Sequence, residues 1–179
     1  MLGHRLDTKI LLVLGSSPII QNQKKCVYKT GLQIQKVVFQ TLADSEVVLS
    51  PEEKDMGVIL IDIGSGSTNY IAYSSGAPVH VGGINRGSDL VTSDIAYLFQ
   101  LPKAAAESLK LTDGSCCSPG IGEDEMIVTP SLGGKPAIRM PKKEFAKVIE
   151  ARMAEILLMI QQDLQDNQIQ GPFGAGIVL

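Results

Sequence analysis

A run of small residues after a single carboxylate has the composition of a phosphate-binding turn. The heptapeptide DIGSGST occupies residues 62–68, directly after the apolar run 58–61. Its glycines can adopt positive φ and let backbone N–H groups point at an anion, and its hydroxyls add further donors. Asp62 would hold a hydrated Mg²⁺ rather than a phosphate, because like charges need the metal between them. The same residue types are also the usual formers of a hairpin turn, so both interpretations stay open.

Two further sets of charges lie on segments with helical spacing. Glu107 and Lys110 are three residues apart, so one face of a helix can present both. Lys143, Lys147 and Arg152 lie within the longest helical pattern of the chain. A solvated ion pair and a solvated charged face are the ordinary explanations of such patterns. The spacing alone therefore leaves open whether either set binds a ligand.

The composition limits the class of protein. The chain has 179 residues with 44% hydrophobic and 20% charged residues, which is typical of a folded globular protein. Its net charge of -3 and its lack of clustered Lys and Arg argue against a nucleic-acid partner, because neutralising phosphates needs such clusters. Cys26, Cys116 and Cys117 lack the paired spacing of a zinc site. We therefore expect reduced thiols and a cytoplasmic protein.

The elements that must position these residues alternate between strands and helices, which indicates an α/β fold. Apolar or β-branched runs predict strands at 10–14, 34–39, 58–61, 70–73, 79–84, 126–128, near 138 and at 177–179, the last of them buried. Helical spacing predicts helices over 18–29, 42–49, from 88 to the break at Pro102, from there to about 112, and over 142–164. Ser88 or Asp89 is the expected N-cap of the third helix. The strands at 58–61 and 70–73 would pair as a hairpin around the DIGSGST turn.

The hairpin and its neighbours resemble the FtsA family of bacterial cell-division proteins, within the actin, hexokinase and Hsp70 superfamily. The similarity is carried, in chain order, by GLQIQKVVFQTLADSEVVLSPEEKDMGVILIDIGSGSTN, SDLVTSDIAYLFQLPKAAAESLK, SLGGKP, KVIEARMAEI and AGIVL. It implies an α/β fold made of actin-like ATPase (ribonuclease H-like) subdomains with a mixed sheet.

The resemblance also implies that the chain is an internal piece of the family's architecture. The expected parts are the end of subdomain 1C at 1–35, a return through subdomain 1A at 36–56, subdomain 2A with the phosphate hairpin at 57–102, subdomain 2B at 103–170 and the start of a return to 2A at 171–179. The family's first phosphate motif and its membrane-targeting amphipathic helix would lie outside the chain. Half of a phosphate clamp is expected to bind ATP weakly or not at all.

The resemblance implies roles for residues of the nucleotide site. Phosphate contacts are expected from Gly64, Ser65, Gly66, Ser67 and Thr68, with Asp62 near Mg²⁺. Glu107 and Lys110 would reach the adenosine of ATP, and Gln40 would orient the attacking water. Ser65 stands where the family commonly has glycine, and Asn69 stands where it commonly has Asp. Binding of ATP is therefore a stronger expectation than its hydrolysis.

The resemblance implies partners as well. The helix 142–164 matches the one that receives the C-terminal peptide of the tubulin-like division protein FtsZ, and Lys143, Lys147 and Arg152 would meet acidic residues of that peptide. The family's role is an adaptor that links FtsZ filaments to the cytoplasmic face of the inner membrane, self-associates as actin-like filaments and recruits later division proteins. The alternative function is a phosphotransferase or phosphatase of the same superfamily.

Overall fold

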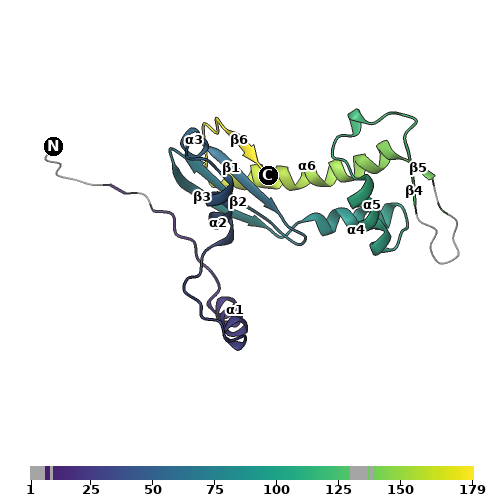
Figure 1. The fold of residues 1–179 in the computed structure, drawn as a ribbon. Helices are drawn as coiled ribbons and strands as arrows, with labels where there is room; N and C mark the ends of the chain where they lie inside the picture. The colour runs from purple at the N-terminus through teal and green to yellow at the C-terminus, as the bar shows by residue number, and fades with distance from the viewer. Residues whose placement is uncertain (1–6, 9, 130–136, 138) are drawn as a thin grey trace. The chain divides into compact units, whose positions relative to one another are not determined.

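The computed structural model describes residues 7–8, 10–129, 137 and 139–179 (Figure 1). These residues form two compact units. The first unit contains the chain up to Ile61 together with Tyr70–Val81 and Gly171–Leu179, and the second contains Asp62–Asn69 and Gly82–Gln170.

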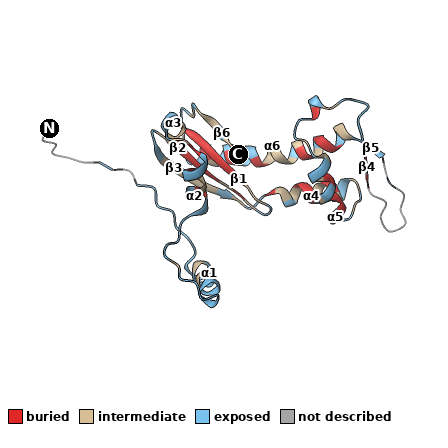
Figure 2. Cartoon of the chain, viewed as in Figure 1, coloured by how far each residue is buried: buried red, intermediate tan, exposed pale blue. Residues whose placement is uncertain are grey.

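A four-stranded sheet with strand order β3-β2-β1-β6 carries the DIGSGST turn. Its strands are β1 (Val58–Ile63), β2 (Thr68–Ser74), β3 (Ala77–Ile84) and β6 (Gly176–Val178). β6 pairs in parallel with β1, with Val58 opposite Gly176 and Leu60 opposite Val178. The predicted hairpin and the strand after it are confirmed, and residues 58–61 are buried, as expected for a strand with neighbours on both sides (Figure 2).

Three of the predicted strands differ from the structure, and residue 138, near which another strand was predicted, lies outside the described residues. Residues 10–14 and 34–39 form no strand, and side chains such as Leu12 and Val38 are exposed. An apolar run becomes a strand only where a neighbour completes its backbone hydrogen bonds, and no described strand pairs with either run. The terminal strand does form, but it lies at the sheet edge with Ile177 58% exposed, so the prediction that it is buried is wrong.

Three helices belong to the first unit, namely α1 (Ser17–Lys29), α2 (Gln40–Val48) and α3 (Pro51–Met56). The first two correspond to predicted helices, although α2 begins two residues before the prediction. α3 was not predicted, yet the segment has a capping box: the backbone N–H of Glu53 donates to Ser50 Oγ (3.2 Å), and the backbone N–H of Ser50 donates to Glu53 Oε2 (2.8 Å). The sequence Ser-Pro-Glu-Glu therefore contained a helix-start signal.

A buried hydrogen bond joins α2 to the sheet. Ser45 Oγ and the hydroxyl of Tyr73 lie 2.7 Å apart, and both residues are buried. Ser45 Oγ also donates to the carbonyl of Leu42 at 2.7 Å, so Tyr73 supplies the hydroxyl hydrogen of the shared bond. Tyr73 packs in a core cluster with Leu49, Val58, Leu60 and Ile71.

The second unit consists mainly of three helices: α4 (Ser88–Leu98), α5 (Lys103–Asp113) and α6 (Lys142–Asp166). A 3₁₀ turn η1 (Ser118–Gly120) and the antiparallel strands β4 (Met126–Val128) and β5 (Arg139–Pro141) complete it. The core is formed by Val91 and Ile95 of α4 with side chains of the other two helices, among them Ala106, Leu109, Phe145 and Ile149. The helix predicted over 142–164 is confirmed as α6, and it buries an apolar stripe of Phe145, Ile149, Ile156, Ile160 and Leu164. The N-cap of α4 is Gly87 rather than Ser88 or Asp89.

The hydroxyl of Tyr73 provides a test of this packing. We expect Tyr73→Phe to lower the free energy of unfolding by about 1 kcal/mol, because it removes one buried hydrogen bond and changes no apolar contact. Tyr97→Phe is the matched control, since Tyr97 is 83% exposed. Urea unfolding followed by circular dichroism measures both variants, and equal effects of the two substitutions would contradict the assignment.

Candidate functional site

The DIGSGST turn is held by backbone hydrogen bonds to itself and to the start of α4. The N–H of Gly64 donates to the carbonyl of Ser67 at 2.9 Å. The N–H groups of Ser88 and Asp89 donate to the carbonyls of Gly64 and Ser65 at 3.0 and 2.9 Å. Two carbonyls of the turn are therefore directed at the helix start, where backbone N–H groups need partners.

The donors of the turn divide into engaged and available groups. The hydroxyl of Thr68 is buried and donates to the carbonyl of Arg86 at 2.8 Å, so it stabilises the turn instead of facing solvent. Ser65 and Gly66 are exposed, and Ser67 is half-buried. Within the part of the chain that the structure describes, no backbone carbonyl receives the N–H groups of Ser65, Gly66 and Ser67. These three amides and two serine hydroxyls are the groups that the turn can offer to an anion.

Two glycines shape the turn for different reasons. A Cβ on Gly66 would meet nothing within 4 Å, so the space over this residue is open. A Cβ on Gly87 would lie 2.4 and 2.5 Å from the carbonyl oxygens of Ser65 and Gly64. Gly87 thus allows the start of α4 to approach the turn. We did not predict this role, although a glycine directly before a predicted helix was a usable signal.

The remaining predicted residues of the nucleotide site lie in different units. Asp62 is half-buried in β1, just before the turn, and belongs to the same unit as the turn. Gln40 is exposed at the first position of α2 and belongs to the first unit. The structure therefore brings Asp62 next to the expected phosphate donors and places Gln40 at the N-terminus of a separate helix.

Glu107 and Lys110 form more than the simple surface ion pair suggested by their spacing. Lys110 Nζ lies 2.7 Å from Glu107 Oε2 and 2.9 Å from the hydroxyl oxygen of Thr92 in α4. The Thr92 hydroxyl hydrogen-bonds to the same Glu107 oxygen, and Thr92 is fully buried. Lys110, followed by Thr92, holds the pKa of the Glu107 carboxyl below its ordinary value by hydrogen bonding. Thr92 was not predicted, because its role depends on the packing of α4 against α5.

One residue connects this cluster with the turn. Ser88 donates its N–H to the carbonyl of Gly64, and its own carbonyl accepts a hydrogen bond from Lys110 Nζ at 3.4 Å. The N–H of Ser88 therefore contacts the DIGSGST turn, and its carbonyl contacts the Glu107–Lys110 pair. The second unit alone brings these two parts of the predicted site together.

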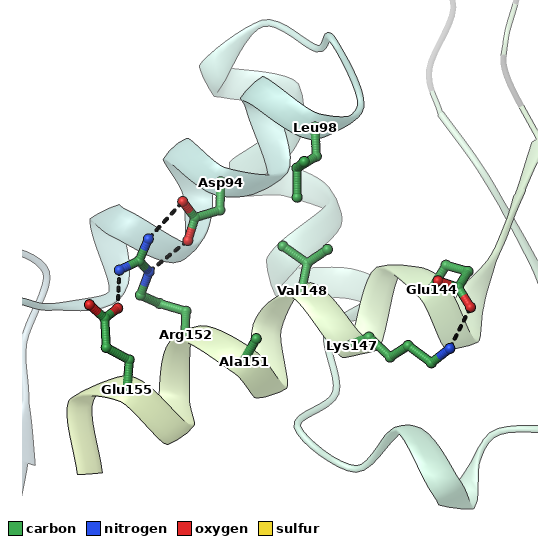
Figure 3. A pocket seen from close by; sticks show the side chains of 8 residues that line it. All are labelled: Asp94, Leu98, Glu144, Lys147, Val148, Ala151, Arg152 and Glu155. Atoms are coloured by element: carbon green, nitrogen blue, oxygen red, sulfur yellow. Dashed lines mark hydrogen bonds and ion pairs between the residues drawn. The ribbon is translucent and has the colours of Figure 1, made fainter. Parts of the chain in front are cut away.

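A groove of about 510 Å³ between α4 and α6 contains two of the predicted peptide-binding cations (Figure 3). Leu98, Val148 and Ala151 line it with apolar surface. Its charged lining residues are Asp94, Glu144, Lys147, Arg152 and Glu155.

Each predicted cation already has a carboxylate partner within the chain. Arg152 donates from Nε and Nη2 to the two oxygens of Asp94, at 2.7 and 3.0 Å, and from Nη1 to Glu155. Lys147 Nζ lies 2.6 Å from Glu144, and Lys143 pairs with Glu123. Asp94 raises the pKa of Arg152, and Glu144 raises that of Lys147, both chiefly by hydrogen bonding. An acidic ligand would therefore have to exchange with these internal partners.

Other features of the described residues bear on metals and membranes. Cys26, Cys116 and Cys117 are free thiols. No group of three His, Cys, Asp or Glu residues lies close enough to hold a metal among the residues searched. In the same part of the chain, no helix combines the length and apolar character needed to cross a bilayer.

Sequence comparison finds one matching protein family and several similar proteins. The family described as "Cell division protein FtsA" matches residues 59–174. The chain is 36% identical over 181 residues to the cell division protein FtsA of Borreliella burgdorferi and 37% identical over 182 residues to that of Neisseria meningitidis serogroup B. Each alignment covers 100% of this chain and 44% of the relative, so the chain spans less than half the length of these proteins.

Comparison with solved structures confirms the expected fold class. MreB5 of Spiroplasma citri bound to ADP superposes with a TM-score of 0.68 at 17% identity, covering 84% of this chain and 48% of that one. A PilM-PilN type IV pilus biogenesis complex gives a TM-score of 0.58 at 19% identity, covering 84% and 37%. The chain thus has the mixed α/β fold of actin-like ATPase subdomains.

Titration of Glu107 tests the Thr92 cluster. We expect its pKa to lie below the ordinary value of about 4.3 and to rise in Thr92→Val, with a larger rise in Lys110→Met. Because the folded-state pKa is lowered, the stabilisation from this group is present above about pH 4.3 and is lost as pH falls through the folded pKa.

NMR titration of the side-chain carboxyl measures the effect. Thr112→Val is the control, because Thr112 lies on α5 but bonds to Ser108 and Asp113 rather than to Glu107. If Thr92→Val moves the Glu107 pKa no more than Thr112→Val does, the cluster does not set this pKa.

Proposed function

The chain belongs to the FtsA family of cell division proteins, and we propose that it supplies one side of an ATP site and a docking groove for the C-terminal peptide of FtsZ. The observation that carries this proposal is the arrangement of the second unit. There α4 contacts the DIGSGST turn through its first residues, the Glu107–Lys110 pair through Thr92, and the groove through Asp94.

The phosphate side of the proposed site is the turn itself. The amides of Ser65, Gly66 and Ser67 would receive the phosphate oxygens, and the open space over Gly66 leaves room for them. Gly64 and Thr68 would shape the turn, because their own donors are engaged internally. Asp62 would hold a hydrated Mg²⁺, which neutralises part of the phosphate charge when bound.

The adenosine side of the proposed site is the Glu107–Lys110 pair. With its pKa lowered, Glu107 is ionised at neutral pH and can only accept hydrogen bonds, which suits the hydroxyl groups of a ribose. Lys110 and Thr92 hold the carboxylate in place. The solved structures of MreB5 bound to AMPPNP and to ADP support a nucleotide as the ligand of this fold.

Hydrolysis would need groups on both sides of the nucleotide. We propose Asp62 and Gln40 for this role, with Gln40 orienting the attacking water. The chain spans 44% of the length of its relatives, and we propose that it supplies one side of such a site. We therefore expect weak ATP binding by the chain alone.

The proposed peptide site is the groove between α4 and α6. Its apolar lining would take apolar side chains of the FtsZ peptide, while Arg152, Lys147 and the nearby Lys143 would meet its acidic residues. In the whole protein these sites would serve an adaptor that links FtsZ filaments to the inner membrane, recruits later division proteins and self-associates as actin-like filaments. Residues 57–102 would correspond to subdomain 2A and residues 103–170 to subdomain 2B.

Gly66→Ala tests the phosphate site. A Cβ at this position meets no neighbour, so we expect the free energy of unfolding to change by less than about 0.5 kcal/mol. The methyl group would occupy phosphate space, so Mg-ATP at millimolar concentration should no longer shift the amide NMR signals of Ser65, Gly66 or Ser67. Gly120→Ala, which makes an ordinary contact elsewhere in the same unit, should retain these shifts.

Equal shifts in both variants would refute the phosphate site. A phosphate-release assay on the unmodified chain and on Asp62→Ala tests the alternative function. Release of phosphate from ATP or polyphosphate above background, lost in Asp62→Ala, would favour a phosphatase or phosphotransferase over an adaptor.

Arg152→Glu tests the peptide site. We expect it to weaken binding of the FtsZ C-terminal peptide about tenfold or more, because buried arginines at interfaces often dominate the binding energy. Lys147→Glu, at a more exposed pair, should weaken it about two- to threefold. Lys25→Glu on α1 makes the same charge change on an exposed residue of the first unit and should have no effect. Fluorescence anisotropy with labelled peptide measures all three, and wild-type affinity in Arg152→Glu would remove the groove as the site.

A further inference from the structure

We propose that the two carboxylates bound to Arg152 have opposite roles in partner binding: Asp94 positions the guanidinium, whereas Glu155 occupies donors that a carboxylate of the partner takes over. This inference rests on the proposed peptide groove and concerns how that groove selects an acidic ligand. It assigns a positioning residue on α4 and an internal competitor on α6.

Asp94 is built as a fixed partner. Its two oxygens receive Nε and Nη2 of Arg152 at 2.7 and 3.0 Å, which is the bidentate geometry that fixes the plane of a guanidinium. It comes from a different helix, and both side chains are mostly shielded, 27% exposed for Asp94 and 23% for Arg152. α4 itself is held by the buried Val91 and Ile95 on either side of this position. Asp94 therefore fixes the direction in which the remaining N–H groups of the Arg152 guanidinium, its outer edge, point.

That outer edge still has donors to offer. A guanidinium carries five N–H groups. Asp94 takes one from Nε and one from Nη2, and Glu155 takes one from Nη1. One N–H on each terminal nitrogen remains. The end of a guanidinium presents one N–H of Nη1 and one of Nη2 side by side, which is a second bidentate site for a carboxylate. A carboxylate that replaced Glu155 would gain a second bidentate contact with Arg152 while the Asp94 contact persisted.

Glu155 has the features of an exchangeable partner. It lies three residues after Arg152 on the same helix, it is bonded to one nitrogen, and its side chain is 45% exposed. Figure 3 shows Glu155 and Asp94 on different sides of the guanidinium. Exposed pairs at this helical spacing contribute little to stability, because water and salt screen them. Breaking the contact between Glu155 and Arg152 therefore costs little free energy.

The charges of the groove favour replacement of Glu155 by a peptide carboxylate over binding of the peptide with Glu155 still in place. Asp94, Glu144 and Glu155 carry three negative charges against two positive charges on Lys147 and Arg152, a net charge of one negative. An acidic peptide added to this lining would be repelled. A peptide carboxylate that takes the place of Glu155 leaves the charge next to Arg152 unchanged, and the released Glu155 turns into solvent.

Two substitutions with the same charge change test the proposal. Asp94→Asn and Glu155→Gln each remove one negative charge and keep the size of the side chain, so net charge alone predicts that both tighten binding of the acidic peptide. We expect Glu155→Gln to bind the FtsZ C-terminal peptide about two- to threefold more tightly and Asp94→Asn to bind it about five- to tenfold more weakly. Anisotropy titrations at low and physiological salt measure both, with thermal unfolding to establish that each variant is folded.

The outcomes separate this inference from the proposed function. Tighter binding in both variants would show that only net charge matters, and weaker binding in both would show that Glu155 does not compete; either overturns the inference. If Asp94→Asn does not fold, Asp94→Glu retains the charge and displaces the carboxylate, and we expect weaker binding there as well, with unchanged binding overturning the positioning role. Wild-type affinity in Arg152→Glu would instead reject the groove itself.

Discussion

The burial of one face of α4 is the constraint on which the functional geometry of this chain depends. Val91 and Ile95 anchor the helix in a core shared with Leu109 of α5 and Phe145 of α6. Because that face is buried, the side chains at the other positions of α4 point in fixed directions. Thr92 reaches α5 and bonds to the Glu107–Lys110 pair. Asp94 reaches α6, where it fixes the plane of Arg152. The apolar core therefore determines two polar sites that share no side chain.

The start of α4 in turn constrains the orientation of the DIGSGST turn after β1. The free N–H groups of a helix start need acceptors, and the carbonyls of Gly64 and Ser65 provide them. The turn is thereby oriented with the carbonyls of Gly64 and Ser65 toward the helix. Gly87 permits the contact, since a side chain there would collide with both carbonyl oxygens. A nucleotide bound at the turn and a peptide bound in the groove would both contact elements held by α4, which offers a physical route by which one ligand could influence the other.

Much of this arrangement could be predicted from local sequence, and the rest could not for definite reasons. The DIGSGST hairpin and the long helix over 142–164 depend on nearby residues, and both predictions were confirmed. The runs 10–14 and 34–39 have strand composition but no partner among the described strands, and a strand is defined by its partner. Thr92 and Asp94 are ordinary polar residues in sequence. Their roles exist only because α4 packs between two other helices, which no spacing rule reveals.

Hydrogen exchange of the chain with and without the FtsZ C-terminal peptide tests the central claim most directly, because it locates the peptide without any substitution. If the groove between α4 and α6 is the docking site, added peptide should slow exchange in α4 and in the first half of α6, and leave α1 and the strands β1 and β2 unchanged. Slower exchange in α1 or in β1 and β2 while α4 and α6 remain unaffected would contradict the account.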